Sequence, residues 1–78
     1  MEILAFGIVK DIFNSPAIDI DIKSGITVDE LKIQLETKYP RLNLLGSYMI
    51  AVNNEYTSVN DLILDGDKIA VIPPVSGG

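Results

Sequence analysis

The residues best suited to chemistry stand at the end of the chain, in residues 69–78, which run IAVIPPVSGG. The last two are Gly77 and Gly78, which would place a carboxylate at the tip of a segment without side chains. Because glycine has no Cβ, such a segment can enter a slot that is too narrow for any other residue. The pattern therefore indicates chemistry at the carboxylate of Gly78, carried out inside the active site of another protein.

A short spacer separates this tip from an apolar run. The spacer consists of Pro73, Pro74, Val75 and Ser76. Its two prolines have no N–H to donate to a sheet, and their fixed φ favours extended geometry. Residues 69–72 are all apolar, as in a strand buried on both faces. A frayed chain end is the alternative, but it would not need a stiff spacer anchored in a core strand. We therefore divide the chain into a domain, residues 1–72, and an extended tail, residues 73–78.

The composition excludes several kinds of chemistry from the chain itself. None of its 78 residues is cysteine or histidine, so it has no thiol nucleophile, no disulfide and no imidazole base or metal ligand. The net charge of −5 would repel nucleic acid and favours a basic protein partner. No apolar run is long enough to span a bilayer and no targeting segment is recognisable, so we expect a cytoplasmic protein with no membrane partner.

Two sets of carboxylates are candidate sites. Asp19 and Asp21 stand in residues 17–23, where isoleucine alternates with polar residues, which predicts the solvated face of a half-buried strand. Three further aspartates stand close together later in the chain: Asp61, Asp65 and Asp67. These lack the ligand count and spacing of a calcium loop and are typical of turns. The sequence therefore predicts no metal site.

The elements that would hold the tail begin with two strands. Residues 2–9 open with an apolar run, which predicts a strand buried on both faces. Residues 10–13 predict a short helical turn and residues 14–16 a turn. The alternating residues 17–23 predict the second strand.

One helix is predicted with a defined beginning and end. Thr27 and Glu30 have the spacing of a capping box, with Thr27 as the N-cap. Pro40 ends the helix. Its apolar stripe, with spacings of three, four and four, consists of Val28, Leu31, Leu35 and Tyr39. Ile33 lies off this stripe, and we expect its side chain to be partly exposed.

The second half of the chain predicts mostly short elements. The first three are a loop at residues 41–47, a strand at residues 48–52 and a tight turn at residues 53–54. They are followed by a short return strand at residues 55–57, a connector at residues 58–64 and a glycine turn at residues 65–67. The tight turn is indicated by two asparagines, which tolerate positive φ. In the connector we expect three buried side chains, those of Val59, Leu62 and Leu64.

Together these elements predict an α+β fold with a mixed sheet of four to five strands and one main helix packed on one face. The first two strands would form a hairpin, and the last strand would lie beside the first, in parallel, in the middle. One helix covers only one face of a sheet, so apolar side chains on the other face should remain partly exposed. We expect this patch, which includes Phe6 and Ile72, to bind a partner.

The whole chain, residues 1–78, resembles the small subunit of molybdopterin synthase, the sulfur-carrier type of the ubiquitin-like β-grasp family that also includes the thiamine sulfur carrier. The resemblance is most specific in residues 65–78, where Asp-Gly-Asp, an apolar strand, Pro-Pro-Val-Ser and Gly-Gly follow one another. The glycine pair alone is less specific, since ubiquitin-like modifiers share it. Members often have an aromatic residue at the position of Ile72, which keeps the apolar contact here but has no ring.

The resemblance implies a sulfur carrier for molybdenum cofactor biosynthesis. A carboxylate, with a pKa of about 3.5, is ionised at neutral pH and is a poor electrophile. Gly78 would therefore be adenylated by an E1-like activating enzyme that uses ATP, and a sulfur donor protein would convert it to a thiocarboxylate. The sulfur would then pass to cyclic pyranopterin monophosphate in the large subunit of molybdopterin synthase.

In this picture the chain is a non-catalytic subunit of a two-subunit transferase and binds no cofactor. The large subunit would supply the catalytic groups, in a heterotetramer with two copies of each chain. The residues that it would take into its active site, besides Gly78, are Pro73, Pro74, Val75, Ser76 and Gly77.

Two alternatives stay open at this point. The first is a sulfur carrier for another pathway, such as thiamine synthesis or tRNA thiolation. The second is a ubiquitin-like modifier joined to lysines, or a binding module with an inert tail. A modifier would accumulate as isopeptide-linked adducts, whereas a carrier would stay free or bind one large subunit.

Overall fold

Five strands form one mixed sheet in the order β2-β1-β7-β4-β5. The computed structural model describes residues 1–22 and 24–74. The strands of this sheet are β1 (Glu2–Ala5), β2 (Ala17–Asp19), β4 (Met49–Val52), β5 (Glu55–Tyr56) and β7 (Ile69–Ile72). Two further strands, β3 (Ile26–Thr27) and β6 (Leu62–Ile63), pair with each other in a second, small sheet. The predicted fold class, a mixed sheet with a main helix on one face, is confirmed.

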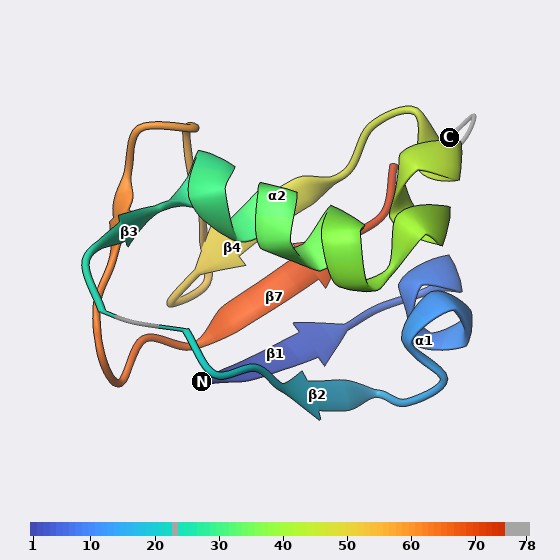
Figure 1. Ribbon diagram of the computed structural model, residues 1–78, viewed down its shortest axis with the longest axis horizontal. Coiled ribbons are helices and arrows are strands. Elements are labelled where there is room, and N and C mark those ends of the chain that lie inside the picture. The colour runs from blue at the N-terminus through green and yellow to red at the C-terminus, as the bar shows by residue number, and fades with distance from the viewer. Residues whose placement is uncertain (23, 75–78) are drawn as a thin grey trace.

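The middle of the sheet is occupied by β7, as predicted. It runs parallel to β1, with Leu4 opposite Ala70, and antiparallel to β4, with Ala51 opposite Ala70. The predicted pairing of the first two strands is also found, since β1 and β2 are antiparallel. Because β1 and β7 are parallel, both end at the same side of the molecule, where the short helix α1 (Ile8–Phe13) lies (Figure 1).

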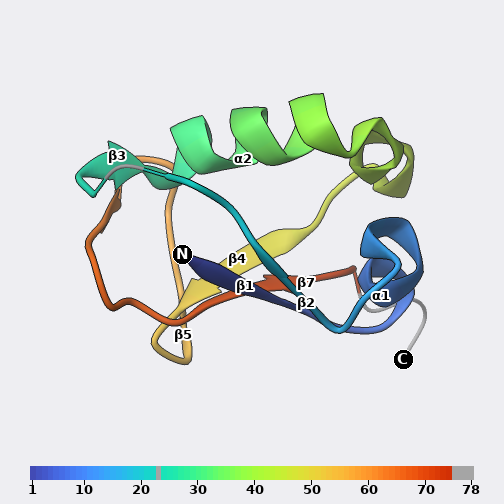
Figure 2. The same ribbon diagram turned by 60° about the horizontal axis from the view of Figure 1, so that its bottom comes forward.

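The core lies between the sheet and the main helix α2 (Val28–Lys38), which covers one face of the sheet (Figure 2). Fully buried side chains from both layers meet there: Ile3, Leu31, Leu35, Ile69 and Val71. Strand residues point alternately to the two faces, so this packing sends Leu4, Ala70 and Ile72 to the other face. None of these three is fully buried.

The helix α2 begins and ends as predicted. Thr27 Oγ1 accepts a hydrogen bond from Glu30 N at 3.1 Å, and Glu30 Oε1 accepts one from Thr27 N at 3.1 Å. These two bonds make the capping box and satisfy backbone donors that the first turn leaves open. Pro40 follows the C-cap residue, Tyr39. Of the predicted stripe Val28, Leu31 and Leu35 are buried and Tyr39 is half-buried, whereas Ile33 is 57% exposed.

The first predicted strand is too long. It ends at Ala5, and the helical turn expected at residues 10–13 is part of a helix that already begins at Ile8. Gly7 makes the change of direction with φ of 55°, a conformation that suits glycine. The prediction missed a helical spacing that competes with the strand pattern: Val9, Ile12 and Phe13 are all buried on one side of α1.

Two further boundaries differ from the prediction. Residues 41–47 are not simply a loop, because a 3₁₀ helix, η1 (Pro40–Leu45), buries Leu42 against the core. Proline at its first position has the fixed φ that a helical start requires. The second strand stops at Asp19, although Ile20 and Ile22 remain buried, so the predicted alternation persists beyond the ladder as far as Ile22.

The burial predicted for the connector is wrong. Val59, Leu62 and Leu64 are 49%, 60% and 53% exposed, whereas Ile63 is fully buried. The cause is the short strand β6, which pairs with β3 and directs Ile63 inward and its two neighbours outward.

Hydrogen bonds from two turns hold the start of β7. Asn53 and Asn54 have the positive φ predicted for the tight turn, 53° and 69°. The side chain of Asn53 accepts from Lys68 N at 3.0 Å and donates to Asp67 Oδ1 at 3.0 Å. Asp67 Oδ2 also accepts from Leu64 N at 2.8 Å. The β4–β5 turn is thereby tied to the Asp-Gly-Asp turn that leads into β7.

This network predicts a pH dependence of stability. The donors Leu64 N–H and Asn53 hold the pKa of Asp67 below its ordinary value of 3.8. A carboxyl whose pKa is lower in the folded state contributes stability above the unfolded pKa and loses it as the pH falls through the folded pKa. Asp67→Asn should therefore lose less stability than the wild type between pH 7 and acid pH, measured by urea unfolding.

Asp11→Asn is the matched control, since the Asp11 side chain makes no hydrogen bond to any described residue. It should follow the wild-type dependence. An equal loss of stability on acidification in wild type and Asp67→Asn would contradict the role given to Asp67.

Candidate functional site

The base of the predicted tail packs against the beginning of α1. Pro73 is half-buried and Pro74 is exposed. A Cβ on Gly7 would lie 3.0 Å from Pro73 Cγ, so the glycine leaves the room that the proline ring occupies. The four remaining residues of the predicted tail lie outside the described residues: Val75, Ser76, Gly77 and Gly78. The fold therefore fixes where the tail begins, directly after a central strand.

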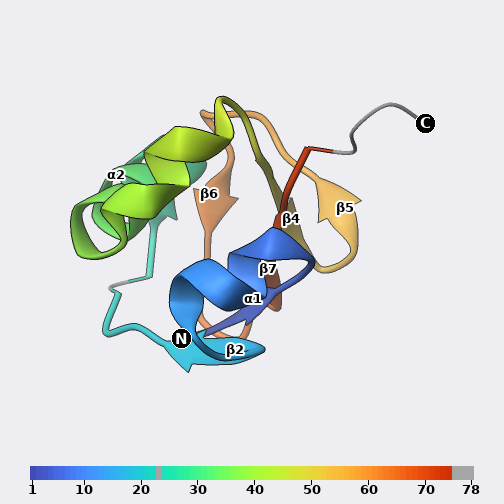
Figure 3. The ribbon, with the colours of Figure 1, turned by 90° about the vertical axis from the view of Figure 1, so that its right-hand side faces the viewer.

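The sheet face that α2 leaves uncovered is largely apolar. The strand registers place four residues in one row across the sheet: Leu4, Ala70, Ala51 and Tyr56. Ile72 lies opposite Met49 in the next row, nearer the tail. In a view from the end where β7 leads into the tail, α2 and β5 lie on opposite sides of β4 (Figure 3). We call this surface the open face.

The open face holds a groove with a volume of about 290 Å³. Both residues of the predicted partner patch, Phe6 and Ile72, line it, so the structure brings them together. Phe6 is 46% exposed and Ile72 is half-buried. The other lining residues are Leu4, Ala51, Asn54, Tyr56, Lys68, Ile69 and Ala70. We call this depression the apolar groove; that a partner binds in it stays a prediction.

The sequence did not point to two exposed side chains of the open face. Tyr56 is 67% exposed and Met49 is 44% exposed. Tyr56 belongs to a two-residue strand that carries no alternation of its own. Its place beside Ala51 follows only from the register of the β4–β5 turn. The two asparagines that make this turn were the one signal from which that register could have been derived.

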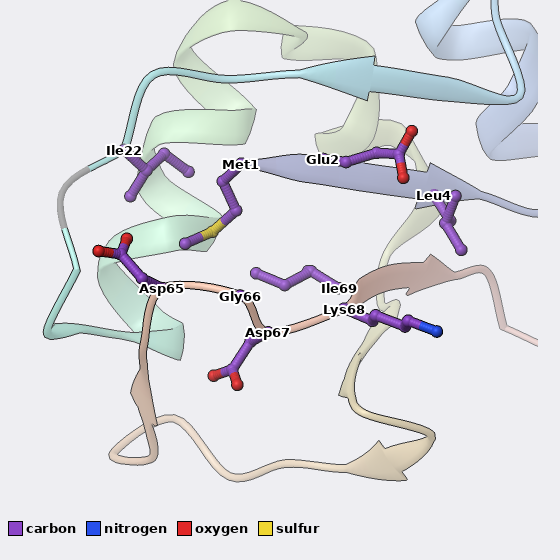
Figure 4. A pocket seen from close by; sticks show the side chains of 9 residues that line it. All are labelled: Met1, Glu2, Leu4, Ile22, Asp65, Gly66, Asp67, Lys68 and Ile69. Atoms are coloured by element: carbon purple, nitrogen blue, oxygen red, sulfur yellow. The ribbon is translucent and has the colours of Figure 1, made fainter.

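A second depression, of about 600 Å³, adjoins the apolar groove at the end of the open face that lies away from the tail. Figure 4 shows its side chains: Glu2 and Leu4 come from β1, and Asp65, Asp67 and Lys68 come from the turn before β7. The two depressions share Leu4, Lys68 and Ile69. We call the carboxylates of Glu2, Asp65 and Asp67 the acidic rim.

Two of the other carboxylates singled out in the sequence, those of Asp61 and Asp19, have structural partners. Asp61 Oδ2 accepts from Ser58 N at 2.9 Å, as expected of a turn aspartate. Asp19 is exposed, and its Oδ1 lies 2.9 Å from the Met1 ammonium, whose hydrogen bond and charge lower the Asp19 pKa. Within residues 1–22 and 24–74, no group of three or more acidic side chains could hold a metal ion.

One buried phenol is the other group with a displaced pKa. Tyr48 is buried beside α2, and its hydroxyl donates to Glu36 Oε2. Burial, followed by the hydrogen bond to Glu36, raises the Tyr48 pKa above its ordinary value. The Nζ of Lys32 lies 4.7 Å from the centre of the same ring. This cluster ties α2 to the start of β4. It is not among the residues that line the apolar groove.

The fold and the site define a β-grasp domain of the ubiquitin-like type, with a proline spacer that continues from its central strand. A model described as the ThiS family matches residues 3–78, and the chain belongs to this family. Among the described residues, no helix is both long and apolar enough to cross a bilayer.

Relatives and solved structures agree with this assignment. The chain is 34% identical over 80 residues to the molybdopterin synthase sulfur carrier subunit of Mycobacterium tuberculosis, covering all of this chain and 96% of that protein. It is 31% identical, with a TM-score of 0.68, to a chain in the complex of subunits 1 and 2 of the molybdopterin-converting factor from Helicobacter pylori, covering 99% and 96% of the two chains. It is 25% identical, with a TM-score of 0.79, to the small archaeal modifier protein 1 of Methanosarcina acetivorans, covering 99% and 94%. The predicted resemblance to the molybdopterin synthase small subunit is confirmed.

Proposed function

We propose that this protein is the sulfur carrier subunit of molybdopterin synthase. The observation that carries the proposal is the path of the chain from the central strand β7 into the Pro-Pro spacer beside an uncovered apolar face. Relatives that bear the name of sulfur carrier subunit, such as the one from M. tuberculosis, align with the whole of this chain. Residues 1–72 act as the scaffold and residues 73–78 as the tail that it presents.

In this function Gly78 carries the reacting group. An E1-like enzyme that uses ATP adenylates the carboxylate, and a sulfur donor protein converts it to a thiocarboxylate. The large subunit then takes in the tail and passes the sulfur to cyclic pyranopterin monophosphate. The chain has no cysteine or histidine, so acid and base groups come from its partners. Gly77 keeps the tail slender, and the spacer residues set its reach.

The large subunit is the partner that we expect to bind the open face. A structure similar to this chain belongs to a complex of subunits 1 and 2 of the molybdopterin-converting factor. Phe6 and Ile72 would make the apolar contact next to the entering tail, in a heterotetramer of two small and two large subunits. Exposed apolar surface of this kind is typical of protein interfaces.

Covalent attachment to other proteins is a second candidate function. It is favoured by the likeness to the small archaeal modifier protein 1 of M. acetivorans, whose fold matches with a TM-score of 0.79. The same carboxylate, once adenylated, could acylate a lysine amine instead of a sulfur donor. Carriers for thiamine or tRNA thiolation share the family and the tail, so they stay alternatives to the molybdopterin pathway.

The mass of the intact chain purified from its own cells tests the proposal. We expect a fraction of the chain in which one oxygen of Gly78 is replaced by sulfur, and this fraction should donate sulfur to cyclic pyranopterin monophosphate when the large subunit is added. Isopeptide-linked adducts on many proteins, with no thiocarboxylate, would favour the modifier. A purely unmodified mass in sulfur-replete cells that use molybdenum would contradict both carrier functions.

A further inference from the structure

We propose that the large subunit covers the open face from the tail to the acidic rim, and that it does so with basic side chains placed beside an apolar anchor. The anchor fills the apolar groove, and the basic side chains pair with the acidic rim. This inference rests on the proposed function, and it adds the acidic rim to the predicted patch of Phe6 and Ile72.

The first argument is the size that a stable interface requires. A specific interface buries about 800 Å² of each partner, which is a large share of the 4916 Å² surface of this small chain. The side chains next to the tail, those of Phe6, Met49 and Ile72, occupy only one end of the open face. A partner that extends from this end along the strands would add the apolar groove to the area that the tail buries.

The second argument is the continuity of the surface. The apolar groove and the second depression are neighbours on the surface, because Leu4 and Lys68 line both of them. Lys68 directly precedes β7 and stands four positions before Ile72, which is about 13 Å at about 3.3 Å per residue. Glu2 stands on the same face of β1 as Leu4, two residues away. A protein surface seated on Ile72 reaches the acidic rim within the width of an ordinary interface.

The third argument is the uncompensated charge. Within residues 1–22 and 24–74 the one ion pair joins the Met1 ammonium to Asp19. The three carboxylates of the acidic rim therefore form no ion pair with a described side chain, although Lys68 lies nearby. Asp67 is fixed by hydrogen bonds from Leu64 N and Asn53, which hold its carboxylate in place. Basic groups on the partner would complete these pairs and speed association.

The same charge disfavours a second copy of the chain as the occupant. Each copy has a net charge of −5, and a symmetric dimer over the open face would bring two acidic rims into the same interface. Like charges opposed across an interface are unfavourable. A protein partner with basic side chains is the occupant that the charges favour.

The test is a binding titration of the full chain with the large subunit from the same organism, at low and at high salt. Glu2→Lys and Asp65→Lys should each raise Kd on the order of 10-fold at low salt, and the difference from wild type should shrink at high salt. Asp67 is left unchanged because it holds the turn. The matched control is Asp29→Lys, which changes the net charge equally but lies at the start of α2, on the covered side of the sheet.

The outcomes separate this inference from the proposed function. A wild-type chain that binds the large subunit, together with rim variants whose Kd equals that of Asp29→Lys, overturns the inference and leaves the proposed function in place. A wild-type chain with no measurable binding overturns both. Sedimentation that shows a dimer of the free chain, dissociated by Leu4→Lys, would assign the open face to a second copy and also overturn the inference.

Discussion

Deletion of Gly78 should abolish sulfur transfer and leave the free energy of unfolding unchanged. The loss is expected to be complete, because the deletion moves the terminal carboxylate back to Gly77, one residue short of the position at which the partners react with it. Stability should persist because the buried side chains of the core extend from Ile3 to Val71. The measurements are thiocarboxylate formation by intact mass, single-turnover sulfur transfer, and urea unfolding.

Two control variants make this result specific. Appending one alanine after Gly78 keeps every residue of the chain but moves the carboxylate, and it should be as inactive as the deletion. Ser76→Ala, which keeps the terminal glycines, should retain transfer within a few-fold. A deletion variant that still forms a thiocarboxylate, or that loses several kcal/mol of stability, would contradict the division into scaffold and tail.

The parts of the fold that depend on local chemistry could be derived from the sequence. The capping box of Thr27 and Glu30 involves residues three apart, so its hydrogen bonds are set by the helix itself. The tight turn depends on two asparagines that tolerate positive φ. The central position of β7 follows from a composition that is apolar on both faces, because only an interior strand can use it.

The parts that depend on competition between elements could not be derived. The run from residue 2 to 9 fits a strand, yet Val9 lies in a helix because Ile12 and Phe13 complete a buried helical side. Leu62 and Leu64 fit a buried connector, yet pairing of β6 with β3 buries Ile63 instead. In each case a contact with a distant element decides between two local patterns.

The same distinction decides which residues of the candidate site could be predicted from the sequence. Phe6 and Ile72 were predicted because one helix cannot cover two faces of a sheet, which is an argument from layers and needs no register. Tyr56 and the acidic rim were not predicted, since they join the open face through cross-strand pairing and through turns between strands. Chemistry at the carboxylate of Gly78 was predicted from residue types alone, whereas its sulfur chemistry was implied by the family resemblance.

Truncation of the apolar groove should weaken the complex with the large subunit while leaving the domain folded. Phe6→Ala and Ile72→Ala each remove a side chain that lines the groove next to the tail. If both are central contacts, each should cost about 2 kcal/mol of binding free energy, or about 30-fold in Kd. Phe6 is 46% exposed, so its truncation should lower the free energy of unfolding by less than about 1 kcal/mol.

Ile33→Ala is the matched control for these two variants. Ile33 is also an exposed apolar side chain, 57% accessible, but it lies on α2, away from the open face. Its truncation should leave Kd unchanged, measured by calorimetry with the large subunit. Binding that weakens equally in all three variants would show a general effect of truncation, and unchanged binding in Phe6→Ala and Ile72→Ala would remove the apolar groove from the interface. A loss confined to these two variants would place the docking surface beside the tail, because only a partner seated on the open face contacts both side chains at once.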